Sequence, residues 1–259
     1  QGGIDYLVVL GTTGESATLS KTEKQLVADT VVRANAGRLP LVLGVGGNNT
    51  AAVIEDLKTL DLSEFAAILS VSPYYNKPSQ EGVYQHFKQV SQACELPLII
   101  YNVPPRTGSN ITAETTLRLA RDFDNIIGIK EASGDFEQAL CLLRDKPAGF
   151  MIISGEDKLA LPLVLAGGDG VISVIGQGLP KEFSQMIQLG LKGESKEAFE
   201  IFYRLLESID LIFEEGNPSG IKCLLDLLDI SSDRVRLPLV PATEVLRQKM
   251  TKFVSTLKK

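Results

Sequence analysis

The chain has 259 residues, 44% of them hydrophobic, which is enough to bury a large core in a single domain with an appendage. Its net charge of −6 gives no reason to expect nucleic acid or an anionic membrane as partner, so we expect a small molecule. No apolar run reaches the roughly 18 residues of a membrane span, and no signal peptide is visible. A reducing cytoplasm is therefore the simplest expectation.

Three cysteines and one histidine limit the possible metal and nucleophile chemistry. Cys94, Cys141 and Cys223 have no paired spacing, so we expect neither a metal site nor a disulfide framework. His86 alone would have to serve any Ser-His-Asp triad or multi-histidine zinc site. It sits in a helical pattern, and we expect it at a helix surface or an interface.

Apolar strand-like runs alternate with amphipathic helical stretches from the start of the chain. This alternation, with a repeat of roughly 20 to 35 residues, indicates βα units and a parallel sheet. Four helices follow a residue that can cap a helix: Ser20, Asn49, Ser79 and Thr112. The predicted strands are 6–10, 41–44, 66–70, 98–101, 126–130, 150–154 and 170–174, and the predicted helices between them are 22–36, 50–60, 82–94, 113–121, 136–143 and 158–166.

Seven predicted strands exceed a flavodoxin-like sheet and fall one short of a (β/α)8 TIM barrel. The chain enters its first strand without a methionine, so we expect an α/β barrel over residues 1–193 whose first βα unit is missing from this sequence. A barrel that lacks a strand has open edges. From about Glu194 the pattern is helical only, with an apolar stripe from Phe199 to Phe213 that includes Tyr203. Residues 194–259 are predicted to form a C-terminal helical cap.

The active site of a βα barrel lies at the carboxyl ends of its strands, and Lys130 stands where one predicted strand ends in a small-residue loop. Partial burial there disfavours the ammonium form and favours the free amine, which can attack a carbonyl. A strand-end lysine that simply reaches water is the ordinary alternative. Other groups predicted on the same rim decide between the two.

Two further strand ends carry polar groups. After the first strand, backbone amides and the hydroxyls of Thr12 and Thr13 can bind a carboxylate, although an ordinary tight turn is the alternative. Tyr101 ends another strand and can move a proton, and Arg106 in the following loop can hold a carboxylate through two parallel hydrogen bonds. A tyrosine that caps the core and a solvated arginine are their alternatives. Together with Lys130, these groups describe a Schiff-base site for a 2-oxo acid.

Five motifs follow one another along the chain. They are Gly11-Thr-Thr-Gly-Glu-Ser16, Ser72-Pro-Tyr-Tyr-Asn-Lys-Pro78, Tyr101-Asn-Val-Pro-Pro-Arg-Thr-Gly108, Ile129-Lys-Glu-Ala-Ser-Gly134 and Asn217-Pro-Ser-Gly-Ile-Lys222. In this order they closely resemble the dihydrodipicolinate synthase family of pyruvate-dependent class I aldolases, whose superfamily includes N-acetylneuraminate lyase. Each motif alone is weak, but the combination is specific and covers the chain except for the absent first βα unit.

The resemblance implies that Lys130 forms the Schiff base with pyruvate and that Tyr101 donates and accepts protons. It also implies a relay from Thr13 through Tyr101 to Tyr75, with Tyr75 reaching in from a neighbouring subunit. The expected assembly is a homotetramer made of two tight dimers. No cofactor is expected, because the Schiff base itself activates the substrate.

The resemblance assigns the remaining site residues to substrate binding. Thr12 and Thr13 would hold the pyruvate carboxylate, and the backbone at Gly155 and Ile172 would line the same pocket. Arg106 would bind the carboxylate of the second substrate, L-aspartate 4-semialdehyde. The implied product is 4-hydroxy-tetrahydrodipicolinate, an intermediate of diaminopimelate and lysine biosynthesis.

One feature of the family is altered in this chain. Ser16, Asn48 and Tyr74 match the effector site of lysine-inhibited members. The acidic residue and the histidine of that site are replaced, so we expect weak or absent lysine feedback, an expectation that inhibition at sub-millimolar lysine would contradict. The replacing residues are Ala52, Lys21 and Lys24.

Two alternatives stay open at this point. The sugar-acid lyases of the superfamily share the lysine and the tyrosine but usually lack an arginine in the loop after Tyr101, so Arg106 and the Thr12-Thr13 pair favour the synthase. The other alternative is a catalytically silent barrel that only binds a 2-oxo acid or serves as an oligomeric partner. No motif is broken, which argues against it.

Overall fold

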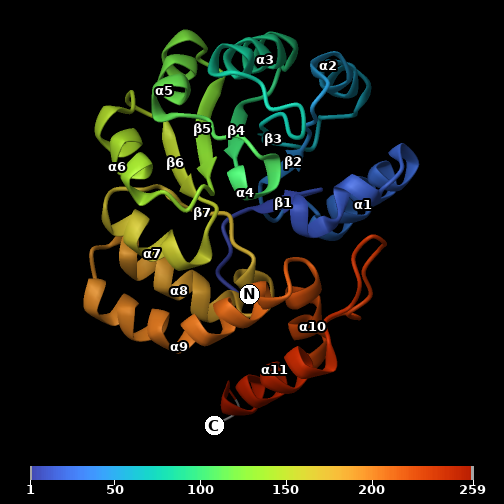
Figure 1. Cartoon of the computed structure of the whole chain (residues 1–259), viewed down its shortest axis with the longest axis vertical. Coiled ribbons are helices and arrows are strands. Elements are labelled where there is room, and N and C mark those ends of the chain that lie inside the picture. Colours follow the sequence, from blue (N-terminus) through green and yellow to red (C-terminus); the bar gives the residue numbers. More distant parts are fainter. Residues whose placement is uncertain (1, 258–259) are drawn as a thin grey trace. The chain divides into compact units, whose positions relative to one another are not determined.

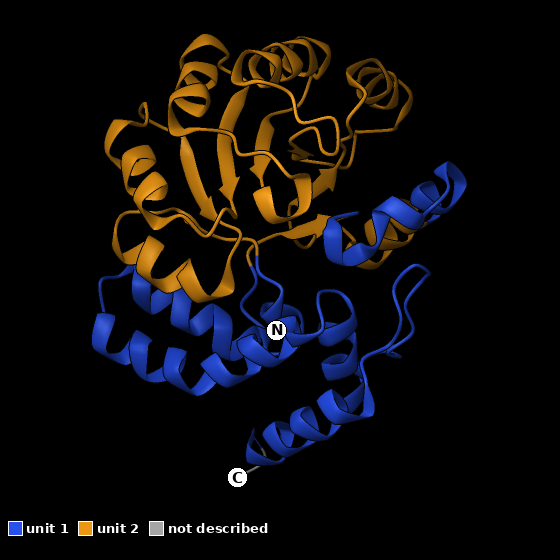
Figure 2. Cartoon of the chain, in the orientation of Figure 1, with its two compact units in different colours: residues 1–4, 10–26, 173–259 blue, residues 5–9, 27–172 orange. Residues whose placement is uncertain are grey.

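The computed structural model describes residues 2–257, and contacts within the chain divide it into two compact units (Figure 2). Unit 2 holds the seven strands that the structure describes, whereas the regular structure of unit 1 is helical. No helix within the described part of the chain is long and apolar enough to cross a membrane. Unit 1 comprises residues 1–4, 10–26 and 173–259, and unit 2 comprises residues 5–9 and 27–172.

Unit 2 is built on a curled, open sheet of seven parallel strands that pair in chain order, as the alternating sequence pattern predicts (Figure 1). Parallel strands need a long crossover, and helices supply it between most neighbouring strands. The last strand is shorter than predicted, because a 3₁₀ helix at Ile175–Gln177 follows it closely. The strands are β1 Leu7–Val9, β2 Leu41–Gly44, β3 Ala67–Val71, β4 Leu98–Asn102, β5 Ile126–Glu131, β6 Met151–Ser154 and β7 Gly170–Val171.

The helices between the strands begin where the sequence places capping residues. The side chains of Asn49, Ser79 and Thr112 each accept a hydrogen bond from a backbone amide in the first turn. Ser20 and Glu23 bond to each other's backbone amides, which makes a capping box. All four predicted caps are therefore confirmed. The helices are α1 Lys21–Asn35, α2 Thr50–Thr59, α3 Gln80–Ala93, α4 Pro104–Thr107, α5 Ala113–Asp122, α6 Phe136–Asp145 and α7 Asp157–Leu165.

The central strands are buried on both faces, which explains their nearly continuous apolar sequences. In β4, Leu98 and Ile100 are fully buried on one face. Ile99 and Tyr101 alternate with them, so they point to the opposite face, where they join an apolar cluster that also contains Leu69. This second face is the one that carries Tyr101 and, from the neighbouring strand, Lys130.

Unit 1 contains a helix that sequence analysis did not predict. Helical-only structure was expected from about Glu194, but α8 already begins at Pro180, a favoured residue for the first turn. Phe183, Met186 and Ile187 are buried at helical spacing along it. The helices of this unit are α8 Pro180–Leu191, α9 Ser195–Glu214, α10 Ser219–Leu227 and α11 Glu244–Leu257.

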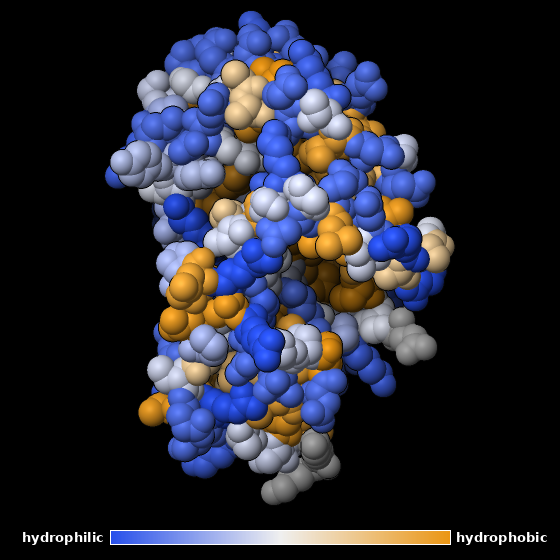
Figure 3. All heavy atoms as spheres, turned by 90° about the vertical axis from the view of Figure 1, so that its right-hand side faces the viewer, coloured by the Kyte–Doolittle hydropathy of each residue, from blue (hydrophilic) through white to orange (hydrophobic). Residues whose placement is uncertain are grey.

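The buried face of α9 is rotated from the predicted stripe. Ile201, Leu205 and Ile212 are buried, whereas Tyr203, a predicted member of the stripe, is 66% exposed. The tyrosine stacks on Phe199 with ring centroids 5.6 Å apart. Figure 3 shows one face of the molecule, on which patches of hydrophobic side chains appear among predominantly hydrophilic ones. Exposed apolar side chains of this kind are normal on a protein surface unless they form a large patch.

His86 was expected at a helix surface or an interface, and that expectation is wrong. Its side chain is buried in α3, only 4% exposed, with Nδ1 2.9 Å from the Thr50 hydroxyl oxygen and the ring edge-on to Phe87. Nε2 has no hydrogen-bond partner among the described residues. Burial lowers the pKa of His86 from 6.5 to about 4, because charging the ring inside the protein costs solvation.

The low pKa of His86 predicts a loss of stability in acid. Between about pH 6.5 and pH 4 the unfolded chain protonates this ring while the folded chain does not, so the free energy of unfolding falls as the pH falls, by about 3 kcal/mol in total. Urea denaturation across this range should show a steeper fall for the wild type than for His86→Gln. Parallel pH profiles for the two proteins would contradict the assignment.

Candidate active site

The pairing register of two strands brings Lys130 and Tyr101 together. Tyr101 of β4 lies opposite Lys130 of β5, so the two side chains project from the same face of the sheet. Both are buried, and the Lys130 Nζ lies 4.2 Å from the centroid of the Tyr101 ring. The predicted pairing of amine and phenol is therefore present.

Gly155 and Ile172 lie on the same side of the sheet. A Cβ atom at Gly155 would lie 2.9 Å from the Lys130 Cε and 2.6 Å from the Cβ of Ala132, so only glycine fits beside the lysine. The Ile172 amide donates to the Ser154 carbonyl at 2.9 Å, and its side chain packs against the cluster that contains Tyr101. Gly155 thus borders the lysine, and Ile172 borders the cluster that contains the tyrosine.

The next residue of each strand forms a second buried pair on the opposite face. Asn102 lies opposite Glu131, and its Nδ2 donates to the two carboxylate oxygens at 3.0 and 3.2 Å. Asn102 also accepts a bond from the Ile111 amide at 2.9 Å. These bonds tie the residue after Tyr101 to the residue after Lys130.

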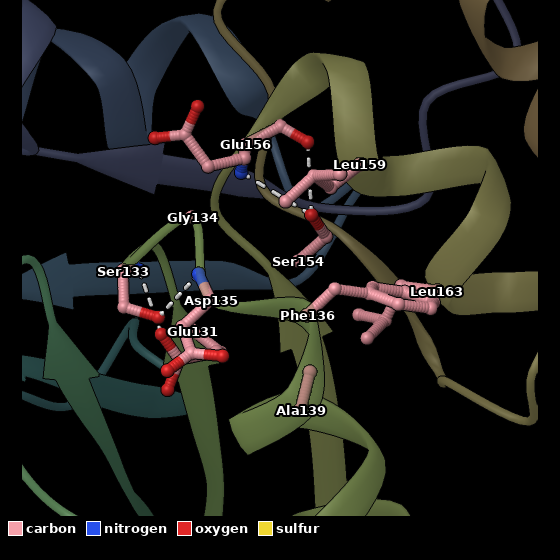
Figure 4. A pocket seen from close by; sticks show the side chains of 10 residues that line it. All are labelled: Glu131, Ser133, Gly134, Asp135, Phe136, Ala139, Ser154, Glu156, Leu159 and Leu163. Atoms are coloured by element: carbon pink, nitrogen blue, oxygen red, sulfur yellow. Dashed lines mark hydrogen bonds between the residues drawn. The ribbon is translucent and has the colours of Figure 1, made fainter.

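Two more donors complete the surroundings of Glu131. The Ser133 amide donates to one oxygen at 2.7 Å, and the Gln138 Nε2 donates to the other at 2.9 Å. Figure 4 shows Glu131 and Ser133 at the start of the turn that leads into α6, beside a small pocket. Bonds to a charged acceptor are the strong ones, so this buried carboxylate is well compensated. Sequence analysis missed the network.

Glu156 is a second carboxylate that sequence analysis missed, although it follows β6 just after Gly155. It is half-buried and borders the same small pocket (Figure 4). Burial is the main reason that its pKa is raised, and the neighbouring Asp157 adds to the effect, while Lys130 and Arg106 oppose it. Its carboxyl group therefore lies within electrostatic reach of both predicted cations of the site.

Arg106 was expected in a loop, but it lies on the short helix α4. Its side chain is exposed, as a residue at a pocket mouth would be. The tyrosine loop, which follows β3 and carries Tyr74 and Tyr75, is bonded to this helix, because the Tyr75 amide donates to the Thr107 carbonyl at 3.2 Å. The Tyr75 side chain is 88% exposed, so the chain does not bury it against its own residues.

Of the three effector-site candidates, Tyr74 is exposed, whereas Ser16 and Asn48 are half-buried. The Asn48 carbonyl accepts a bond from the Asn76 side chain at 2.9 Å, which places it beside the tyrosine loop that carries Tyr74. Tyr74 is 41% exposed. Ser16 begins a 3₁₀ helix, Ser16–Thr18, in unit 1.

The Thr12 and Thr13 hydroxyls belong to unit 1, in a 3₁₀ helix at Thr12–Gly14. The Thr13 oxygen lies 3.0 Å from the Nδ2 of Asn217. Glu15, next in the turn, has a positive φ of 54° and accepts bonds from the Lys222 ammonium and, at 2.7 Å, from the Arg236 amide. Burial raises the pKa of Glu15, but these donors outweigh it and leave the pKa below its ordinary value.

Within residues 2–257, no three His, Cys, Asp or Glu side chains are grouped to hold a metal ion. The chemical groups near one another at Lys130 are its own amine, the Tyr101 phenol and, within electrostatic reach, the Glu156 carboxylate. Such a set can form a Schiff base with a carbonyl compound and transfer protons to and from it.

Comparison with known proteins identifies similar chains over nearly the whole length. The model of the dihydrodipicolinate synthetase family matches residues 1–257. A Flavobacterium psychrophilum protein named 4-hydroxy-tetrahydrodipicolinate synthase is 60% identical over 258 residues, which are 100% of this chain and 88% of that protein.

Solved structures agree with the sequence comparison. Dihydrodipicolinate synthase from Thermotoga maritima is 36% identical, with a TM-score of 0.96 over 98% of this chain and 88% of that one. The chloride-inhibited dihydrodipicolinate synthase from Acinetobacter baumannii, complexed with pyruvate, is 37% identical, with a TM-score of 0.93 over 98% of this chain and 87% of that one. The fold described above is therefore one that experimentally solved proteins share.

The buried network predicts a large cost for removing the Glu131 carboxylate. Glu131→Ala leaves the donors of Asn102, Gln138 and Ser133 without their acceptor, so we expect a loss of about 3 kcal/mol or more in the free energy of unfolding. Glu137→Ala, on the exposed face of the same turn, should cost less than about 1 kcal/mol. Urea denaturation of both variants is the measurement, and equal losses would contradict this role of the network.

Proposed function

Because the chain belongs to the dihydrodipicolinate synthetase family, we propose that it condenses pyruvate with L-aspartate 4-semialdehyde to give 4-hydroxy-tetrahydrodipicolinate. It is an enzyme of the lyase class, and its relatives at 50 to 60% identity carry the synthase name. The product belongs to the diaminopimelate route of lysine biosynthesis. The observation that carries the proposal is the buried lysine beside the Tyr101 phenol ring.

The reaction begins at the Lys130 amine. It attacks the carbonyl carbon of pyruvate, water leaves, and a protonated Schiff base forms. Loss of a methyl proton gives an enamine, whose carbon attacks the aldehyde of the second substrate. The amino group of that substrate then attacks the Schiff-base carbon and displaces Lys130 as the free amine, which closes the ring. The Schiff base supplies the electron sink, so the proposal requires no cofactor or metal.

Proton transfer is assigned to three hydroxyl groups. Tyr101 donates and accepts protons at the Schiff base, and Thr13 and Tyr75 extend the relay on either side of it. Tyr75 is 88% exposed in the single chain, which supports its action in a neighbouring subunit. The assembly proposed is a homotetramer made of two tight dimers.

Substrate binding is assigned to groups around the amine. Thr12 and Thr13 hold the pyruvate carboxylate, and the backbone at Gly155 and Ile172 shapes the pocket, a role that their position beside Lys130 and Tyr101 supports. Arg106 binds the carboxylate of the semialdehyde, and its exposure on α4 suits a residue at the entrance.

The architecture proposed for the sheet is a (β/α)8 barrel, in which an eighth strand lies between β7 and β1. Those two strands form the edges of the sheet within residues 2–257. Residues 194–259 are proposed to form a helical cap, the compartment is proposed to be the cytoplasm, and weak lysine feedback stays a prediction. The names of the relatives favour the synthase over a sugar-acid lyase.

Borohydride trapping tests the Schiff base. Incubation with pyruvate and borohydride should add one reduced pyruvyl group, and peptide mapping should locate it on Lys130. Lys130→Met should lose both the adduct and turnover while it stays folded. Lys146→Met, which removes a lysine paired with Asp169 at 2.7 Å, is the matched control and should keep the adduct. A folded wild type without an adduct would favour the silent barrel instead.

Arg106→Ala tests the assignment of the second substrate. Loss of a charge-assisted pair should raise the KM for L-aspartate 4-semialdehyde about 10- to 100-fold, with the pyruvate KM changed less than about twofold. Arg118→Ala removes an exposed arginine that pairs with Glu81 and should change neither constant. An unchanged semialdehyde KM in the Arg106 variant would refute this role.

A further inference from the structure

The motif Asn217-Pro-Ser-Gly-Ile-Lys222 has no role in the proposed reaction, yet it lies against the Thr13 turn within unit 1. The Asn217 side chain is buried, 7% exposed, and its Nδ2 lies 3.0 Å from the Thr13 Oγ1 across 204 residues of sequence. Its Oδ1 lies 3.3 Å from the same oxygen, where it can accept the Thr13 hydroxyl proton in a longer bond. A buried asparagine that bonds to a threonine so far away in sequence calls for a structural or functional explanation.

The two distances decide how the Thr13 proton is used. A threonine hydroxyl has one proton to donate and lone pairs that accept, whereas an amide nitrogen can only donate. Because the nitrogen of Asn217 is the nearer atom, the Thr13 oxygen accepts from it. In this shorter bond the hydroxyl proton is not consumed, so it can be donated to another group in place of the longer bond to Oδ1.

Asn217 itself is held firmly by the packing of the helices on either side of it. A Cβ atom at Gly220 would lie 2.1 Å from the Ile212 carbonyl oxygen, so α10 packs against α9 with no room for a side chain. The Ser219 hydroxyl donates to the Val240 carbonyl at 2.7 Å. The amide therefore projects from a rigid junction.

A second attachment fixes the other end of the turn. The Glu15 carboxylate is bonded to the Lys222 ammonium and to the Arg236 amide, and the Lys222 ammonium also donates to the Arg234 carbonyl at 2.8 Å. The same motif thus contributes a donor at each of its ends, Asn217 to Thr13 and Lys222 to Glu15. The turn that carries the Thr13 hydroxyl is clamped at two points.

We propose that Asn217 is a positioning residue for Thr13: it donates to the hydroxyl oxygen and so directs the hydroxyl proton toward the substrate carboxylate or the proton relay. This inference rests on the proposed function, in which Thr13 serves both. No bond to substrate is assigned to Asn217. It acts through Thr13, by fixing the oxygen and the direction in which the proton is donated.

Asn217→Asp tests the direction of donation with almost no change of shape. An ionised aspartate accepts the Thr13 proton, which reverses the bond, whereas a protonated one supplies a donor again. At pH 8, kcat/KM for pyruvate should fall about 10- to 100-fold, less than the roughly 10²- to 10⁴-fold of a proton-transfer group itself, because Asn217 acts only through Thr13. The ratio of variant to wild-type activity should rise as the pH is lowered. For Asn217→Ala the ratio should be low at every pH.

Two controls separate positioning from general damage. Asn35→Asp alters an equally buried asparagine whose Nδ2 donates to the Leu39 carbonyl at 2.8 Å, and it should cost less than twofold in kcat/KM with no recovery in acid. Borohydride trapping on Lys130 should succeed in the Asn217→Asp protein, which shows that the site is folded. A flat pH ratio for Asn217→Asp would overturn the proposal.

A double-mutant cycle with Thr13→Val distinguishes this inference from the proposed function. Thr13→Val alone should lower kcat/KM strongly, and adding Asn217→Asp should then cost less than about twofold more. If the two effects simply multiply, Asn217 does not act through Thr13 and only this inference fails. If Thr13→Val leaves activity unchanged, the proposed role of Thr13 fails, and this inference fails with it.

Discussion

The pairing register between β4 and β5 is the constraint on which the proposed site depends. It sets Tyr101 opposite Lys130 on one face and Asn102 opposite Glu131 on the other. A slip of one residue would exchange the faces of these side chains, so the lysine would lose the phenol and the carboxylate would lose its donors. The hydrogen bonds around Glu131 therefore help to fix the register. They stabilise the observed alignment of β4 and β5 over alignments shifted by one residue, as apolar packing does elsewhere in the sheet.

Much of this arrangement could be predicted from the sequence, because the carboxyl ends of parallel strands meet on one edge. The strand pattern located Lys130 and Tyr101 at neighbouring strand ends, and in the structure the Lys130 Nζ lies 4.2 Å from the centroid of the Tyr101 ring. The capping residues were predictable for a similar reason, since each acts on its own helix. The Glu131 network was not, because Asn102 and Gln138 are ordinary polar residues until the register and the start of α6 bring them together.

The errors have local physical causes. His86 lies in a helical pattern, but periodicity does not show which helix packs over a given face of another. The face of α3 that carries His86 is covered by α2, whose first residue, Thr50, contacts the ring. The stripe predicted for α9 included Tyr203, but the buried face of the helix is rotated away from this residue, which is exposed. The bond between Asn217 and Thr13 joins residues 204 positions apart, and no spacing rule predicts it. Tyr75 is exposed in the single chain, and the role proposed for it in a neighbouring subunit is one that a single chain cannot display.

Gly155 has a consequence for the volume in which a substrate can sit. With no room for a methyl group at position 155 beside Lys130, the wall that this position presents to the lysine is backbone. Such a wall can be neither deepened nor trimmed by mutation, since glycine is already the smallest residue. In the proposed site, variation in the size of an accepted substrate must therefore come from positions that carry exchangeable side chains, such as Arg106 on α4.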